Sequence, residues 1–296
     1  MFNELQRRRT RGDSATIVSI AFLLLAACVK PRDFHAPAER VVRGTAWTLE
    51  RGTVAPGLGV GGVDSDQLLV DAGVAWAPAK HVETSVNLAH FGGGLANLAL
   101  RSTLLERERW ALGAGASATW VNTDWMWYLD SVDPESTGAD SHLDIVVVPL
   151  YVNSTWTLRD WVDVTGGLSY THAEAFGAVD SEALLFDGSI GGRRLALDGR
   201  AQVYVGRVAI WAGGSLPLGA WILGEAATEV VVDEGVVVGT RTDRWLERPF
   251  GRGWSASGGS QVRFGGTYVD VGVASSAATR AIGFDVAPYV AAHWRL

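Results

Sequence analysis

One stretch, residues 97–121, restricts the fold of this chain more than any other. Apolar residues alternate with small or polar ones in its first half, and after a charged turn at 106–109 the alternation resumes between Trp110 and Trp120. A period of two over two spans of about ten residues predicts a β-hairpin, either in a soluble sheet or in a transmembrane barrel. The second face of the later strand holds only Ala, Gly, Ser and Thr, which are too small to build a packed core. The pattern therefore favours a hairpin that crosses a bilayer, with the two tryptophans near its interfaces.

Composition also favours a membrane barrel over a soluble domain. The chain of 296 residues holds 36 glycines and 13 tryptophans, and charged residues make up 19% of it, below the roughly 25% of an average soluble domain. The net charge of −7 offers no basic field, so we expect no nucleic acid among the partners. Behind a leader of 27 residues, about 270 residues remain, which suffice for roughly ten to fourteen strands.

We predict an all-β fold, a closed antiparallel transmembrane β-barrel of about twelve strands, with ten or fourteen as alternatives. The alternation places the strands at 53–63, 68–77, 82–90, 97–105, 110–121, 145–156, 161–170, 195–205, 208–216, 252–264, 267–273 and 281–296. Short turns follow the even-numbered strands. The long connections at 122–144, 171–194 and 217–251 follow odd-numbered strands, as extracellular loops do in outer-membrane barrels. The last of them is predicted as a large loop or a projecting hairpin, and two further membrane strands are the alternative.

The start of the chain predicts a secretory signal peptide at residues 1–27. Four arginines between positions 7 and 11 precede an apolar run at 15–27 that is too short to span a bilayer as a helix. The run ends in Leu-Ala-Ala-Cys, which resembles the lipobox of bacterial lipoproteins, in which the cysteine is lipidated and becomes the first residue of the mature chain. The resemblance implies lipid attachment at Cys28. The alternative is that Cys28 merely ends the apolar run.

The surroundings of Cys28 suggest where the chain resides. It is the only cysteine, so no intramolecular disulfide can form. In lipoproteins an Asp directly after the lipidated cysteine implies retention in the inner membrane, but Val29 stands there, so we expect the outer membrane of a Gram-negative bacterium. Residues 28–52 are predicted to form a lipidated N-terminus and periplasmic tether, with 45–51 at the inner rim, and residues 53–296 to form the barrel.

Polar side chains on the inward face of the strands are the candidate solute-path residues. They could line a channel and set its selectivity, or pair across the lumen and plug it. Small residues on the inner faces of the first and fifth strands favour a narrow channel. The predicted lumen-lining set is Asp71, Glu83, Asn87, Asn97, Arg101, Asp163, Asp198, Arg200, Gln202, Arg263, Asp270 and Asp285.

A second set of residues is predicted to form an aromatic belt at the bilayer interfaces. Trp and Tyr suit this position because the ring is apolar and its polar group can reach water. The set comprises Trp76, Trp110, Trp120, Trp156, Trp161, Tyr170 and Trp294. Two of its members, Trp156 and Trp161, bracket one predicted periplasmic turn.

No catalytic residue, metal site or cofactor is predicted. The six histidines are scattered and have neither the i, i+4 nor the clustered spacing of a metal site. A serine and a histidine of an outer-membrane acyl-processing enzyme would have to come together from distant strands, so an enzyme is the least favoured interpretation.

Two short runs remain, Thr-Ala-Trp-Thr-Leu-Glu-Arg-Gly at 45–52, before a glycine-alternating strand, and Phe-Gly-Gly-Gly-Leu at 91–95. They resemble outer-membrane barrel families of Gram-negative bacteria that are described as porin-like or as transporters of hydrophobic compounds. The resemblance implies the barrel fold, with outer-membrane lipid around it. We expect a passive pore or a transporter of a small solute. The alternative is a plugged structural or adhesive barrel whose long loops make contacts outside the cell.

Overall fold

The computed structural model describes residues 43–64, 67–88, 95–122, 140–180, 184–232, 236–247, 254–275 and 286–296. Thirteen strands in these ranges form one antiparallel sheet. They are β1 (Val54–Asp64), β2 (Gln67–Ala79), β3 (Val82–Asn87), β4 (Leu95–Arg107), β5 (Trp110–Asn122), β6 (Asp140–Arg159), β7 (Val162–Asp180), β8 (Leu184–Val205), β9 (Val208–Val232), β10 (Val236–Glu247), β11 (Ser255–Phe264), β12 (Thr267–Ser275) and β13 (Ala287–Trp294). No helix among the described residues is long and apolar enough to cross a membrane.

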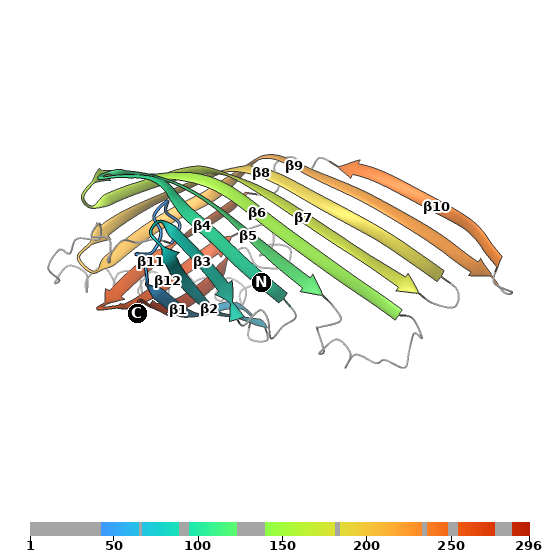
Figure 1. The fold of residues 1–296 in the computed structure, drawn as a ribbon, viewed down its shortest axis with the longest axis horizontal. Coiled ribbons are helices and arrows are strands. Elements are labelled where there is room, and N and C mark those ends of the chain that lie inside the picture. Colours follow the sequence, from blue (N-terminus) through green and yellow to red (C-terminus); the bar gives the residue numbers. More distant parts are fainter. Residues whose placement is uncertain are drawn as a thin grey trace, which may run out of the picture.

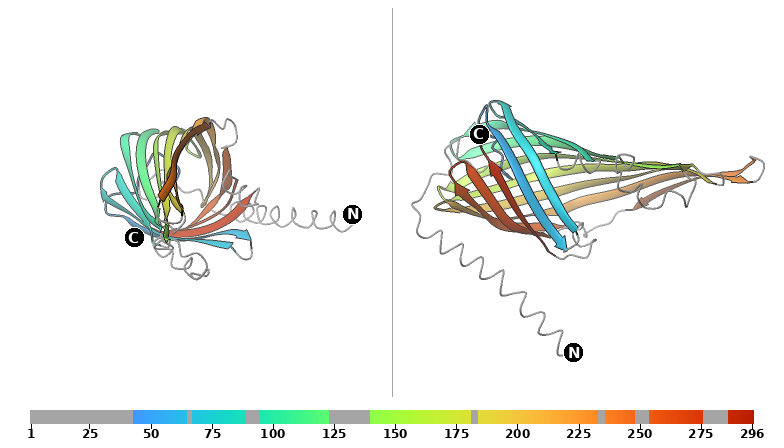
Figure 2. Two further views of the ribbon diagram at one scale, coloured as in Figure 1. Left: turned by 90° about the vertical axis from the view of Figure 1, so that its right-hand side faces the viewer. Right: turned by 90° about the horizontal axis from the view of Figure 1, so that it is seen from below.

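Twelve of these strands close into a barrel (Figure 1, Figure 2). Strands β1 to β9 pair with their neighbours in chain order, and β9 then pairs with β11, β11 with β12 and β12 with β13. The ring closes where β13 pairs with β1, through contacts such as Gly57 opposite His293. The predicted closed antiparallel barrel of twelve strands is confirmed.

Strand β10 lies outside this ring because β9 is longer than its neighbour β11. The first part of β9, from Val208 to Ser215, pairs with β11. Its later part, from Ile222 to Val232, pairs with β10 instead. The two strands form a hairpin that projects beyond the barrel (Figure 1). Of the alternatives for residues 217–251, the projecting hairpin is therefore correct, and two further barrel strands are not.

The predicted loop at 171–194 is wrong. Strands β7 and β8 continue through it and remain paired from Val162 opposite Val203 up to Asp180 opposite Leu185. Likewise β6 begins at Asp140, inside the predicted loop at 122–144, of which residues 123–139 lie outside the described part. The error has a physical cause. A strand beyond the bilayer needs no lipid-facing apolar row, so these extensions lack the regular alternation that marks the lower half of each strand.

The outer surface of the barrel is apolar. Large apolar side chains are exposed on most strands of the ring, including Leu58, Leu98, Leu100, Leu104, Leu150, Val152, Leu168, Leu197, Leu216, Phe264, Val273 and Val290. They alternate along each strand with residues that point inward, so the outward row is mostly apolar while the inward row is mostly small or polar. This apolar surface is far larger than the apolar patches that soluble monomers expose to water.

Candidate functional site: a lumen crossed by the N-terminal segment

The register of the strands brings inward side chains from different strands into rows across the barrel wall. One row holds Thr103, Gly113, Asn153, Gly167 and Asp198 on strands β4 to β8. In such a row a glycine leaves space on the lumen side of the wall, and a neighbouring side chain or another segment can occupy it. The inner faces therefore contain polar groups separated by open positions.

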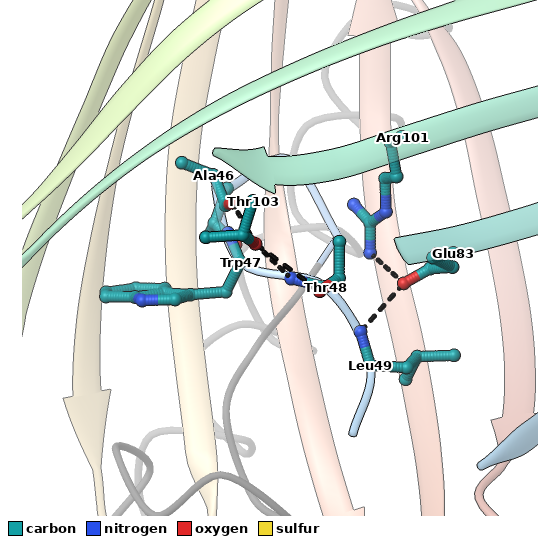
Figure 3. Close-up of polar contacts among 8 residues, drawn as sticks. Ala46, Trp47, Thr48, Leu49, Glu83, Arg101 and Thr103 are labelled. Atoms are coloured by element: carbon teal, nitrogen blue, oxygen red, sulfur yellow. Dashed lines mark hydrogen bonds and ion pairs between the residues drawn. The ribbon is translucent and has the colours of Figure 1, made fainter. Parts of the chain in front are cut away.

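Residues 43–52, which we call the lumen segment, run inside the barrel and are held by backbone hydrogen bonds to its wall (Figure 3). The N–H of Ala46 donates to Thr155 Oγ1 over 2.8 Å, and Thr103 Oγ1 donates to the carbonyl of Ala46 over 2.8 Å. The N–H of Thr48 donates to Thr103 Oγ1 over 3.1 Å. The wall thus provides partners for a segment that has no secondary structure of its own.

The next contact of the lumen segment is charged. The N–H of Leu49 donates to Glu83 Oε2 over 2.9 Å, and Arg101 Nη2 lies 2.7 Å from the same oxygen (Figure 3). The Glu83 side chain is 8% exposed and that of Arg101 is 19% exposed. Hydrogen bonds to ionised groups are stronger than neutral ones, so this carboxylate fixes both the wall arginine and the end of the segment.

Apolar packing adds to these hydrogen bonds. Trp47 and Leu49 are 3% and 4% exposed and form one buried cluster with Ala55, Ala77 and Ala111 on the wall. The segment then leaves the lumen through a turn, in which the N–H of residue 53 bonds to the carbonyl of residue 50. Gly52 has a φ of +86° in this turn, a conformation that glycine adopts readily.

Glycines let the lumen segment approach the wall closely. A Cβ added at Gly113 on β5 would lie 2.8 Å from the carbonyl oxygen of Ala46. On the far side, a Cβ added at Gly44 would lie 2.5 Å from Arg200 Nη1 on β8. The segment therefore contacts wall residues from β1 through β6 and also β8, which places it across the lumen.

The sequence places residues 45–51 at the inner rim of the barrel, and their partners Ala77, Glu83 and Ala111 lie within two residues of the short turns. Thr45 and Ala46 are each 3% exposed, so the segment lies inside the wall. Its polar partners Thr103 and Thr155 carry no pattern that singles them out in the sequence. The only available signal was the pair of glycines, Gly44 and Gly52, flanking a short run with Trp47 and Leu49.

A second polar cluster lies below the lumen segment, near the short turns. Asp163 on β7 is 1% exposed and accepts hydrogen bonds from Tyr204 Oη over 2.6 Å and from Thr157 Oγ1 over 2.8 Å. The neighbouring Gln202 is also 1% exposed. Asp163, Tyr204 and Thr157 thus form a hydrogen-bonded group at these strand ends.

A third cluster occupies the same end of the barrel near β11 to β13. Asp270 accepts a hydrogen bond from Gln261 Nε2 over 2.9 Å, and its other oxygen lies 3.3 Å from His293 Nδ1. The His293 ring stacks on Tyr268 with centroids 4.9 Å apart. The guanidinium of Arg295 lies 4.4 Å from the Tyr268 ring centroid. Arg295 follows the last residue of β13, and burial lowers the pKa of its guanidinium.

Above these clusters the lumen holds two cavities. The Glu83 cavity, of about 420 Å³, lies against β13 and β1 to β4 and is lined by Glu83, Asn87, Asn97, Arg101 and His293. The Asp198 cavity, of about 350 Å³, lies against β6 to β9 and β11 and is lined by Asn153, Asp198, Arg200, Trp211, Ser215 and Ser257. Both cavities also border the lumen segment, the first at Arg43 and Leu49 and the second at Gly44.

Tyr151 separates the two cavities and lines both. Its ring lies over Gly115, where an added Cβ would come within 2.4 Å of the ring atoms. This position lets the side chain reach across β5 toward Arg101 on β4, which stands in the same row. Gly115 is therefore small because Tyr151 crosses it, a role that the sequence alone did not indicate.

The structure brings together several members of the predicted lumen-lining set. Glu83 pairs with Arg101, and Asn97 Oδ1 accepts the backbone N–H of Asn87 over 2.7 Å. Arg263 is buried near Tyr268, whereas Asp198 and Arg200 border a cavity. The side chain of Asp71 and the whole of Asp285 lie outside the described part, as does Cys28. Whether any of the set acts on a solute stays a prediction.

Four members of the predicted aromatic belt are exposed on the outer surface: Trp76, Trp120, Trp156 and Trp161. The remaining three, Trp110, Tyr170 and Trp294, are half-buried. Trp110 donates its indole N–H to Ser154 Oγ, and Trp120 donates to Asp144 Oδ1 over 2.8 Å. An apolar ring with a satisfied polar group suits a membrane interface.

The described histidines that form ion pairs each do so with one carboxylate, as His81 does with Glu106 at 3.5 Å and His172 with Glu174 at 3.4 Å. Within the ranges that the structure covers, no three His, Cys, Asp or Glu side chains are grouped to hold a metal ion.

Comparison with known proteins places the chain beside outer-membrane barrels without assigning a family. No family model and no curated protein matches it. The ferric citrate transporter FecA aligns with 76% of this chain at 9% identity and a TM-score of 0.37, and only 37% of its own length is covered. The translocator domain of the autotransporter NalP from Neisseria meningitidis aligns over 82% of this chain and 86% of its own, at 11% identity and a TM-score of 0.32. The toluene transporter TodX of P. putida aligns over 84% and 90%, at 10% identity and a TM-score of 0.35. At these scores the likeness adds nothing to what the barrel itself shows.

Proposed function

We propose that this chain is an outer-membrane barrel that passes small polar solutes when the lumen segment moves out of the way. The observation that carries the proposal is the segment itself, which crosses a polar lumen and is held there by hydrogen bonds to Thr155, Thr103 and Glu83. Each is a single hydrogen bond of a kind that contributes about 0.5–3 kcal/mol. Together with the buried side chains of Trp47 and Leu49, this set holds the segment in the lumen in the resting state.

The outer surface supports a position in lipid. Its exposed leucines, valines and tryptophans cover the ring from β1 to β13, and each fully buried apolar side chain gains about 1.5–3 kcal/mol when it leaves water. Short turns at one end and long strands beyond the other are typical of bacterial outer-membrane barrels. We place the short-turn end in the periplasm. Lipid attachment at Cys28 would keep the N-terminus close to that end.

The lumen supports passage of polar rather than apolar solutes. Its two cavities, of about 420 and 350 Å³, are bordered by Asn, Ser, Arg and acidic side chains. Charged walls at this range act strongly on ions and dipolar solutes. At Gly113, where the carbonyl of Ala46 lies against the wall, displacement of the segment would leave open space beside β5.

The competing proposal is a permanently plugged barrel that serves as a structural or adhesive element. The specific observation in its favour is the β9–β10 hairpin, which projects beyond the ring and offers a surface for contacts outside the cell. In that case the lumen segment would be part of a permanent plug and would never leave.

Single-channel recording in planar bilayers separates the two. The intact chain should be mostly closed, with brief openings, while a variant lacking residues 44–49 should conduct steadily, because the deletion removes the segment without altering β1 or its pairing with β13. If both proteins are silent, the plugged barrel is correct. If both carry the same current, the segment does not control passage.

A further inference from the structure

The Asp198 cavity has the size of a small-molecule site and carries charges that the protein leaves without ion partners. Its volume of about 350 Å³ falls within the roughly 300–1,000 Å³ of known ligand pockets. Asp198 and Arg200 stand two residues apart on the inner face of β8, opposite Gly167 and Thr165. Both border the cavity.

Neither charge forms an ion pair with a described residue. Arg200 Nη2 donates to the neutral amide oxygen of Gln202 over 3.2 Å, and its guanidinium lies 4.1 Å from the Trp211 ring centroid. Asp198 makes no ion pair or hydrogen bond to any residue that the structure describes. The contrast with the other cavity is clear, because there Glu83 and Arg101 pair at 2.7 Å. Unpaired opposite charges in a confined space favour a ligand that carries both signs.

We propose that the Asp198 cavity binds a small zwitterion of the α-amino-acid type. The ligand's ammonium group pairs with Asp198 and its carboxylate pairs with Arg200. The hydroxyls of Ser215 and Ser257 line the same cavity and accommodate a polar side chain. A simple anion or a simple cation leaves one of the two protein charges unpaired and binds more weakly.

The Asp198 cavity also borders the lumen segment. The effect of zwitterion binding on passage through the barrel therefore rests on the proposed function. Gly44 lines the Asp198 cavity, and its α-carbon lies against Arg200, since a Cβ there would sit 2.5 Å from Nη1. A carboxylate bound to Arg200 changes the surroundings of Gly44. Zwitterion binding therefore alters the time that the segment spends in the lumen.

Isothermal titration of the purified full chain in detergent tests the site with three matched probes. L-serine carries both charges, glycerate replaces the ammonium with a hydroxyl, and ethanolamine lacks the carboxylate. Serine should bind at least about tenfold more tightly than either. Equal affinity for serine and glycerate, or no heat with serine, would overturn the proposal.

Two substitutions assign the charges separately. Asp198→Asn should weaken serine binding and abolish the preference for serine over glycerate, whereas Arg200→Gln should abolish the preference for serine over ethanolamine. Asp187→Asn and Arg193→Gln change exposed charges on the same strand and should leave all three affinities unchanged. A folding defect would weaken the binding of all three probes and would not abolish one preference while leaving the other. If the controls change affinity as much as the site variants, the assignment is wrong.

The binding result and the gating result can fail independently. Titration measures affinity without any current, and the deletion of residues 44–49 is recorded without any ligand. Absence of serine binding together with an open deletion variant would remove this inference and leave the proposed function. Serine binding, together with no current through either the intact chain or the variant lacking residues 44–49, would remove the proposed function and leave the binding site.

Discussion

Two regions of the lumen are built in different ways. At the short-turn end, buried polar side chains satisfy one another, as Asp163 does with Tyr204 and Thr157. In the second region, which the lumen segment crosses (Figure 3), glycines and serines border two cavities. In the first region, side chains of the strands themselves fill the lumen. Closure at the second depends on residues that can leave without breaking a strand pair, and this difference is what makes gating possible.

Substitution of Glu83 should have the largest effect, because it serves both the wall and the segment. Glu83→Gln removes the charge that faces Arg101 at 2.7 Å and weakens the acceptor for the N–H of Leu49. Breaking a largely buried ion pair by removing one partner costs about 3 kcal/mol or more. We expect a lower unfolding midpoint in denaturant and more frequent openings in bilayer recordings. An unchanged midpoint would show that the pair contributes nothing.

Filling the space at Gly113 should act chiefly on the segment, although an added Cβ would also lie 3.0 Å from Asn153 Oδ1 on β6. The side chain of Gly113→Val would meet the carbonyl of Ala46, and crowding of this kind costs about 1–3 kcal/mol. The open probability should rise roughly tenfold, since each 1.4 kcal/mol is worth a factor of about ten. Gly199→Val is the matched control, because a Cβ at Gly199 meets nothing within 4 Å. Equal currents from both variants would contradict the close contact at Gly113.

Removing the tyrosine hydroxyl at the short-turn end should reduce stability without opening the lumen. Tyr204→Phe takes away a 2.6 Å hydrogen bond to the buried Asp163 carboxylate, at a cost of about 1–3 kcal/mol. Denaturant unfolding should detect this loss, whereas single-channel recordings should match those of the intact chain. A rise in open probability would mean that the two regions are coupled rather than independent.

The smallest effect is expected at the exposed pair of Arg109 and Asp160 on neighbouring short turns. Their charged atoms lie 3.2 Å apart, but the side chains are 60% and 86% exposed, and exposed pairs contribute only about 0–1 kcal/mol. Arg109→Gln should change neither the unfolding midpoint nor the current appreciably. A loss of stability comparable with that of Glu83→Gln would show that the expected order of these effects is wrong.

The barrel was predictable from the sequence because lipid imposes a regular pattern. Leu98, Leu100 and Leu104 must face lipid, so the period of two survives and indicates which face of each strand is outward and about how many strands there are. Beyond the bilayer this constraint disappears. Residues 171–194 therefore seemed to be a loop, although the backbone ladder of β7 and β8 continues through them.

The lumen was less predictable because its organisation depends on contacts between distant positions. Inward polar residues such as Glu83 and Arg101 could be identified by alternation, but nothing in the sequence shows that one pairs with the other and also holds Leu49. Thr103 and Thr155 carried no signal at all. A glycine such as Gly113 fits equally well in a strand that faces empty space and in one that faces the lumen segment, so only the three-dimensional arrangement reveals its role.

The most direct test of the central claim is the current through a barrel whose segment can be locked and released. Thr48 and Thr103 have side-chain oxygens 3.3 Å apart, close enough for a disulfide between cysteines at these positions. In Thr48→Cys/Thr103→Cys the oxidised protein should be silent in planar bilayers. Reduction should produce openings at least as frequent as those of the intact chain, because Thr103→Cys also removes a hydroxyl that holds the segment. The single variant Thr48→Cys should not respond to reduction. If the oxidised double variant conducts as well as the reduced one, the lumen segment does not gate the barrel.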